Sequence, residues 1–216
     1  MNDIIFKHNF CESRLHNDQG PEIYNAFSSL FITIIPLLSG FPKNTKFKNI
    51  ALMFIMNGMF SFYYHYQLSW FGKHLDEVTM IIANYYGIRG LLQFYEKENV
   101  NKWNLLNLFV MPVFIAFNTL PQYDFLFPHL FTGYVMVTAF LIKDVAKKFD
   151  ISKTVNNYFI ISILGGISWV ISENFCNEYT TYGHVLWHFM FPFGLYKIIL
   201  IYDDVFTATL KSFESI

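Results

Sequence analysis

The stretch that decides the fold is the apolar run at residues 182–202, which opens with Gly183-His184-Val185-Leu186-Trp187-His188. The run is long enough to cross a bilayer as a helix, which takes about 20 residues. Two histidines four residues apart lie on one face of such a helix, about 6 Å from each other, a spacing that can chelate a metal. Because a lone pair of this kind is more often packed than ligated, a metal site also requires polar residues from elsewhere in the chain.

The composition of the 216-residue chain indicates an integral membrane protein. Hydrophobic residues make up 54% of it and charged residues 14%, whereas charged residues approach a quarter of an ordinary soluble domain. The formal net charge is −1, and tracts rich in lysine and arginine are absent. No nucleic-acid partner is therefore expected. Residues 1–22 are polar and lack the apolar core of a cleavable signal peptide.

Apolar segments separated by short polar connections predict an all-α membrane protein, a seven-transmembrane-helix bundle. The expected helices cover residues 23–40, 50–66, 75–94, 103–120, 125–142, 155–172 and 182–202. Gly72 is expected to break the chain before the third helix. Gly165-Gly166 in the sixth favours a close helix contact over a local widening. The predicted organisation is an N-terminal segment (1–22), a membrane domain (23–205) and a short tail (206–216).

The basic residues of the loops predict the orientation of the bundle. With the N-terminus taken as extracytosolic, ten lysines fall on the inner side and three basic residues on the outer side. The inner set is Lys43, Lys46, Lys48, Lys97, Lys102, Lys143, Lys147, Lys148, Lys153 and Lys211, and the outer set is Lys7, Arg14 and Lys73. This positive-inside bias predicts an extracytosolic N-terminus and a cytosolic C-terminus.

The two cysteines, Cys11 and Cys176, both fall on the outer side in this orientation. They could be two unrelated buried thiols. Because the chain has no others and both face an oxidising compartment, we predict that they form a disulfide. Such a bond would fix the N-terminal segment over the outer mouth of the bundle.

Four titratable side chains from three helices share one depth in this topology: His65, Asp76, His184 and His188. Ionisable residues in a membrane are costly unless they pair, face water or bind something, so they indicate a functional site. Three imidazoles with one open position match a catalytic zinc site. Asp76 would then act as the general base for the attacking water.

Ser61 lies four residues before His65, one turn deeper on the same helix face. Its hydroxyl could stabilise the oxyanion that forms when water adds to a carbonyl, although a serine in a membrane helix commonly bonds the carbonyl four residues back. His74 competes with His65 as the third ligand, and His65 is preferred because helical register ties it to Ser61. Trp187 is either an interfacial aromatic or a substrate-binding residue.

The order Ser-x3-His, an Asp eleven residues after that His, and a late Gly-His-x-Leu-Trp-His forms a specific combination. It resembles the alkaline ceramidases, and more widely the CREST superfamily of seven-helix membrane hydrolases, over nearly the whole chain. The resemblance implies a zinc-dependent amidase that hydrolyses the N-acyl bond of ceramide to a sphingoid base and a fatty acid. It implies that the zinc ligands are His65, His184 and His188. Asp76 would transfer the proton, and Ser61 would stabilise the oxyanion.

The alkaline ceramidases also hold calcium near the N-terminus, through an Asp-Trp-Cys-Glu-x-Asn stretch and a later Glu. Residues 9–14 here read Asn-Phe-Cys-Glu-Ser-Arg, so only Glu12 and Glu22 match that pattern. With fewer carboxylates and Arg14 close by, a hard oxygen-seeking ion would bind more weakly. The resemblance therefore implies at most a weakened calcium site, in which Arg14 can replace the charge of the ion.

Other functions remain as alternatives. A receptor of the progestin and adipoQ type would place the N-terminus and the metal in the cytosol, which the loop charges oppose. A hydrolase that remodels GPI anchors would cleave an ester, which the composition cannot distinguish from an amide. The last alternative is a small heptahelical transporter or structural protein that catalyses no reaction. The preferred reading implies a multi-pass protein of the endoplasmic reticulum or Golgi, with ceramide or a related lipid as its partner and a lumenal active site.

Overall fold

The structure is a computed structural model that describes residues 10–16, 20–95 and 97–214. Every regular element in these ranges is helical. The elements are α1 (Cys11–Leu15), α2 (Ile23–Ser39), α3 (Thr45–Gln67), α4 (Trp70–Leu92), α5 (Lys97–Asn118), the 3₁₀ helix η1 (Pro121–Leu126), α6 (Phe127–Lys148), α7 (Ser152–Asn174) and α8 (Tyr182–Glu214). The part of the chain within these ranges is thus all-α, as predicted.

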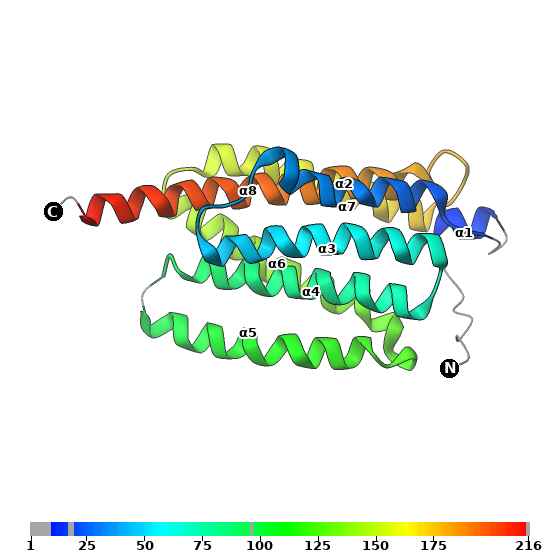
Figure 1. Cartoon of the computed structure of the whole chain (residues 1–216), viewed down its shortest axis with the longest axis horizontal. Helices are drawn as coiled ribbons and strands as arrows, with labels where there is room; N and C mark the ends of the chain where they lie inside the picture. The colour runs from blue at the N-terminus through cyan, green and yellow to red at the C-terminus, as the bar shows by residue number, and fades with distance from the viewer. Residues whose placement is uncertain (1–9, 17–19, 96, 215–216) are drawn as a thin grey trace.

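The long helices α2 to α8 run side by side along the longest axis of the molecule, and α1 lies at one end of this bundle (Figure 1). α7 packs along α8, α3 packs along α4, and α2 lies against both α3 and α8. α5 and α6 pack against α4 on the other side of the bundle. α1 and the start of α8 therefore lie at the same end, although they are far apart in the sequence.

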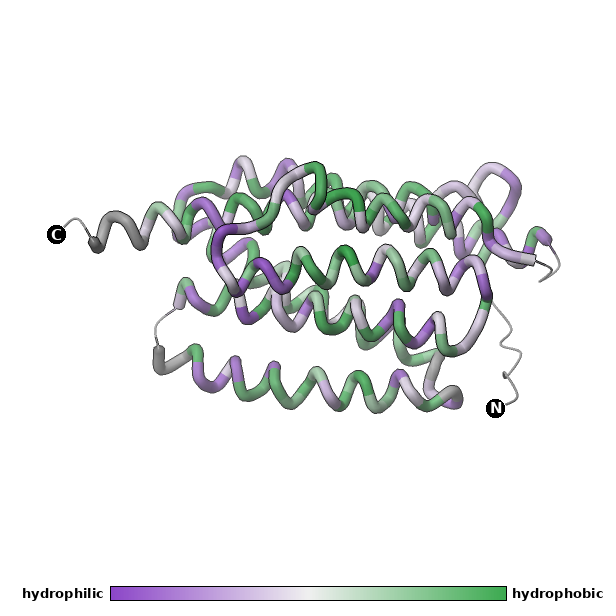
Figure 2. Tube along the Cα trace, in the orientation of Figure 1, coloured by the Kyte–Doolittle hydropathy of each residue, from purple (hydrophilic) through white to green (hydrophobic). Residues whose placement is uncertain are grey.

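Many large apolar side chains are exposed on the outside of the bundle, an arrangement that would be unfavourable in water. Leu105, Phe109, Met136 and Phe140 on α5 and α6 are between 66% and 70% exposed, and hydrophobic residues extend along the helices (Figure 2). Within the described ranges, four helical segments are both long and apolar enough to cross a membrane: Val100–Asn118, Phe127–Lys148, Ser152–Asn174 and Tyr182–Thr209. α2 is a shorter apolar helix.

Gly165 allows close contact between α7 and α8, which confirms the prediction of a close helix contact there. A Cβ atom added at Gly165 would lie 2.7 Å from the backbone nitrogen of Phe191, whereas one at Gly166 would meet only the ring of Trp187, at 3.8 Å. A Cβ at Gly183 would lie 2.2 Å from the carbonyl oxygen of Ser168. Small residues thus let the backbone of α8 approach α7 beside the two histidines.

Gly72 does not break the chain, contrary to the prediction. It lies inside α4, which begins at Trp70 because Ser69 caps the helix by accepting the backbone N–H of Gly72 at 3.1 Å. The chain turns earlier instead, at Leu68, which has a positive φ of 49°. The glycine is needed for packing, since a Cβ there would lie 2.9 Å from the Cα of Tyr64 on α3.

α8 continues beyond the predicted end at residue 202. Asp203 is 3% exposed and accepts the backbone N–H groups of Lys43 and Asn44 at 2.7 and 2.8 Å. The acidic pair Asp203-Asp204 therefore does not end the helix. It joins α8 to the turn between α2 and α3.

Candidate metal centre and active site

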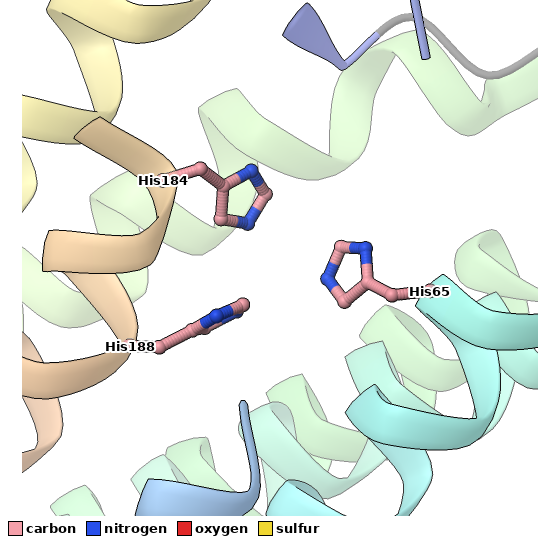
Figure 3. Close-up of side chains that lie close together, drawn as sticks. All are labelled: His65, His184 and His188. Atoms are coloured by element: carbon pink, nitrogen blue, oxygen red, sulfur yellow. The ribbon is translucent and has the colours of Figure 1, made fainter. Parts of the chain in front are cut away.

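The structure brings together His65 from α3 and His184 and His188 from α8. One ring nitrogen from each lies within 4.8 Å of those of the other two, and all three side chains are buried. Figure 3 shows the three rings pointing toward a common centre. Buried histidines that converge in this way have the donor type and the spacing of a site for one metal ion.

Glu22 fixes the orientation of His65. Its Oε2 lies 2.5 Å from Nδ1 of His65, and the two side chains are 1% and 2% exposed. The other carboxylate oxygen, Oε1, accepts a hydrogen bond from the hydroxyl of Ser13. Because a carboxylate accepts the proton on Nδ1, the lone pair of His65 is left on Nε2, which is the arrangement of a metal-bound imidazole.

His188 has a similar partner in Ser28 of α2. The Oγ of Ser28 lies 2.8 Å from Nδ1 of His188 and donates its own proton to the carbonyl oxygen of Asn25, at 3.1 Å. In the tautomer in which the serine oxygen accepts from His188, Nδ1 carries the proton and Nε2 is free to bind a metal. His184 is held more loosely, since its Nδ1 lies 3.5 Å from Oε1 of Glu173 without hydrogen-bond geometry.

Asp76 lies beside this group, at 8% exposure, on α4. Its Oδ1 accepts from Nδ2 of Asn57 at 2.7 Å, and its carboxylate also has a hydrogen bond with Ser61 and an electrostatic interaction with His184. Asn57 contacts the hydroxyl of Thr79 as well, at 3.0 Å. The carboxylate and the hydroxyl that the sequence assigned to one site are thus in contact.

His74 and Trp187 lie in other surroundings. Nδ1 of His74 is hydrogen-bonded to Oδ1 of Asn118 between α4 and α5, outside the histidine group. Trp187 stacks on Phe191, with ring centroids 4.0 Å apart, and packs against Trp169 of α7. These contacts place Trp187 in the α7–α8 interface. A contact between Trp187 and the substrate stays a prediction.

A disulfide joins Cys11 to Cys176, with the two Cα atoms 5.3 Å apart, which confirms the predicted bond. It ties α1 to the loop between α7 and α8. Arg14 strengthens the same junction, because its Nη2 lies 2.8 Å from the carbonyl oxygen and 3.2 Å from Oε2 of Glu173. Phe10 consequently packs edge-on against His184, with ring centroids 4.7 Å apart, and covers the histidine group.

The two carboxylates that match the calcium pattern, Glu12 and Glu22, are both bound by protein donors, whereas Asn9 of that pattern lies outside the described residues. Glu12 is 3% exposed and accepts the backbone N–H groups of Tyr24 and Asn25, one on each oxygen, at 2.9 and 3.0 Å. Burial raises the pKa of the Glu12 carboxyl, although these two donors lower it. Both oxygens of Glu22 are also in use, and Oδ1 of Asn25 is a buried acceptor without a partner. Calcium takes six to eight oxygen ligands, so it would have to displace these donors from Glu12 and Glu22, and Arg14 pairs with Glu173.

Comparison with known proteins identifies the family. A family model described as Ceramidase matches residues 6–214. The chain belongs to the ceramidase family. Mouse alkaline ceramidase 1 is 35% identical over 80 residues, a match that covers 33% of this chain and 29% of the mouse protein. The resemblance drawn from the sequence motifs is thereby confirmed at the level of the ceramidase family.

Sequence reasoning missed three side chains that position the site in this ceramidase-family chain. Asn57 could have been found, because it lies four and eight residues before Ser61 and His65 and so shares their face of α3. Ser28 and Glu173 gave no such signal. Their contacts with His188 and His184 depend on how α2, α7 and α8 pack.

Proposed function

We propose that the chain is a zinc-dependent lipid amidase that hydrolyses the N-acyl bond of ceramide to a sphingoid base and a fatty acid. The observation that carries the proposal is the convergence of His65, His184 and His188 beside Asp76. Membership of the ceramidase family supports the choice of substrate. Ceramide is two-tailed and apolar, which suits the apolar exterior of the bundle.

The donor set favours zinc as the metal. Three imidazoles bind zinc tetrahedrally and leave the fourth position open. A zinc ion held there would lower the pKa of its water to about 7 and polarise the amide carbonyl. Glu22 and Ser28 hold two of the rings in the tautomer that presents Nε2 to the ion.

Three side chains have different roles in the reaction: Asp76 transfers the proton, Asn57 positions Asp76, and Ser61 stabilises the oxyanion. Asp76 accepts the proton of the attacking water as the C–O bond forms, and then delivers it to the departing sphingoid nitrogen as the C–N bond breaks. Asn57 holds the carboxylate of Asp76 for this role. Ser61 would transfer its hydrogen bond from Asp76 to the carbonyl oxygen, on which negative charge develops.

We also propose that α2 to α8 all cross the membrane, with residues 1–22 extracytosolic and residues 206–216 in the cytosol. The loop charges support this orientation. The Cys11–Cys176 disulfide lies at the end of the bundle that carries the histidines and would then form in an oxidising compartment. The active site would face the lumen of the endoplasmic reticulum or Golgi.

The test is turnover of a fluorescent ceramide by the purified, reconstituted chain, with bound zinc measured in parallel. His188→Ala should lose both zinc and activity. Asp76→Asn should keep zinc and lose activity by about 10²-fold or more. Glu178→Gln, at an exposed position in the α7–α8 loop, serves as the control. Full turnover by Asp76→Asn would refute the mechanism, and preferential turnover of an ester lipid would refute the assignment as an amidase.

A further inference from the structure

A hollow of about 200 Å³ lies between the start of α3 and the last turns of α4. It is lined by Thr45, Lys46, Asn49, Tyr86 and Arg89. Lys46 and His65 stand near opposite ends of α3, and nineteen helical residues separate them by about 28 Å. The hollow therefore lies far from the histidine group, at the other end of the bundle, and what it binds does not depend on the proposed reaction.

Two of the lining side chains are cations without an acidic partner among the residues that the structure describes. Lys46 forms no ion pair there, and the contact of Arg89 is with Tyr85, whose hydroxyl lies 3.4 Å from Nη1. Three carboxylates of the described residues at this end have other partners, and one of them, Asp144, accepts from the hydroxyl of Tyr95. Asp203 accepts backbone N–H groups of the α2–α3 turn, and Asp204 pairs with Lys43 at 3.6 Å.

The remaining lining residues add neutral donors. The hydroxyls of Thr45 and Tyr86 and the amide of Asn49 have no hydrogen-bond partner in the described part of the chain. A hollow lined by two exposed cationic side chains and three neutral ones that carry donors matches a group with several acceptor oxygens and a negative charge. A phosphate group has this chemistry, and arginine binds it through its forked donors.

An apolar stripe on α3 leads away from the hollow toward the middle of the bundle. Leu52, Met56 and Met59 follow Asn49 at helical spacing and are 49%, 41% and 51% exposed. Figure 2 shows the change from the hydrophilic turn between α2 and α3 to the more hydrophobic middle of α3. A free phosphate ion would leave this stripe unused, whereas an acyl chain would cover it.

We propose that this hollow binds the phosphate group of an anionic phospholipid, whose acyl chains lie along Leu52, Met56 and Met59. Lys46 and Arg89 neutralise the headgroup, and Thr45, Asn49 and Tyr86 complete its hydrogen bonds. In the proposed orientation the hollow faces the cytosolic leaflet, where anionic lipids are concentrated.

The test is native mass spectrometry of the purified full chain, titrated in detergent with phosphatidylglycerol or with phosphatidylcholine. Phosphatidylglycerol should bind more tightly. Replacement of one cation, Lys46→Ala or Arg89→Ala, should weaken its binding about fivefold, and the double variant about 25-fold. Lys48→Ala is the matched control, because Lys48 is exposed on the same turn of α3 and points about 160° away from Lys46.

Equal binding of phosphatidylglycerol by the double alanine variant and the unaltered chain would overturn the proposal, as would equal binding of phosphatidylcholine. The double variant Lys46→Arg and Arg89→Lys retains both charges and should keep most of the affinity. If this variant lost as much affinity for phosphatidylglycerol as the double alanine variant, the positive charges would not be what binds the lipid, and the proposal would fail. If inorganic phosphate displaced phosphatidylglycerol at a similar concentration, the ligand would be the free ion, and the lipid would be excluded.

Discussion

The backbone and the side chain of Glu22 both contact His65. The N–H of Glu22 donates to the carbonyl oxygen of His65 at 2.9 Å, and Oε2 of the same glutamate lies 2.5 Å from Nδ1 of the histidine. Glu22 immediately precedes α2, and His65 is in the last turn of α3. The start of one helix therefore orients the imidazole at the end of the next, which makes Glu22 a positioning residue for the proposed zinc ligand.

Glu22→Gln is expected to weaken zinc binding by about 10- to 100-fold, since a neutral amide cannot stabilise the Nδ1 proton as a carboxylate does. The measurement is competition for zinc with a chromophoric chelator. Glu22→Asp, which keeps the charge, should recover part of the affinity. Unchanged zinc affinity in Glu22→Gln would show that Glu22 only supports the fold.

The three histidines could be predicted from the sequence, but the role of Glu22 could not. The spacing of His184 and His188 is a local property of one helix, and the polar residues around His65 stand out from their apolar context. By contrast, Glu22 matched a calcium-binding pattern, and its actual partner lies 43 residues away. That contact depends on the α2–α3 packing, which no local pattern encodes.

Gly165→Ala is expected to destabilise the protein by about 1–3 kcal/mol, because the added methyl group would lie 2.7 Å from the backbone of α8 and force the helices apart. Gly166→Ala provides a matched control, since its nearest neighbour would lie 3.8 Å away. The thermal midpoints of the two purified variants, measured in the same detergent, make the comparison. Equal midpoints would argue that α7 and α8 can separate without cost.

The helix boundaries were less predictable than the helices themselves. Gly72 suggests a break in the sequence because glycine disfavours a helix interior. The structure uses it instead for a close approach to Tyr64. The sequence predicts that the last helix ends at residue 202, but α8 continues, and the turn between α2 and α3 satisfies the buried carboxylate of Asp203.

Loss of the Cys11–Cys176 bond is expected to lower stability by about 2–5 kcal/mol, because the unfolded chain is no longer constrained by a closed loop of 165 residues. Release of α1 would also remove Phe10 from its place against His184. The double variant Cys11→Ser and Cys176→Ser should therefore show a lower thermal midpoint and faster proteolysis near its N-terminus. A midpoint equal to that of the oxidised protein would mean that Arg14 and Glu173 hold the junction without the disulfide.

Removal of metal is expected to abolish activity, and zinc alone should restore it. The three histidines offer neutral nitrogen donors, which suit zinc and not calcium. The carboxylates of Glu12 and Glu22 are already engaged by backbone N–H groups, Ser13 and His65, so calcium would have to displace these donors. The measurement is ceramide turnover by chelator-treated protein after addition of zinc, calcium or both. Restoration by calcium alone would contradict the assignment of these contacts, whereas failure of zinc to restore activity would count against the histidine site itself.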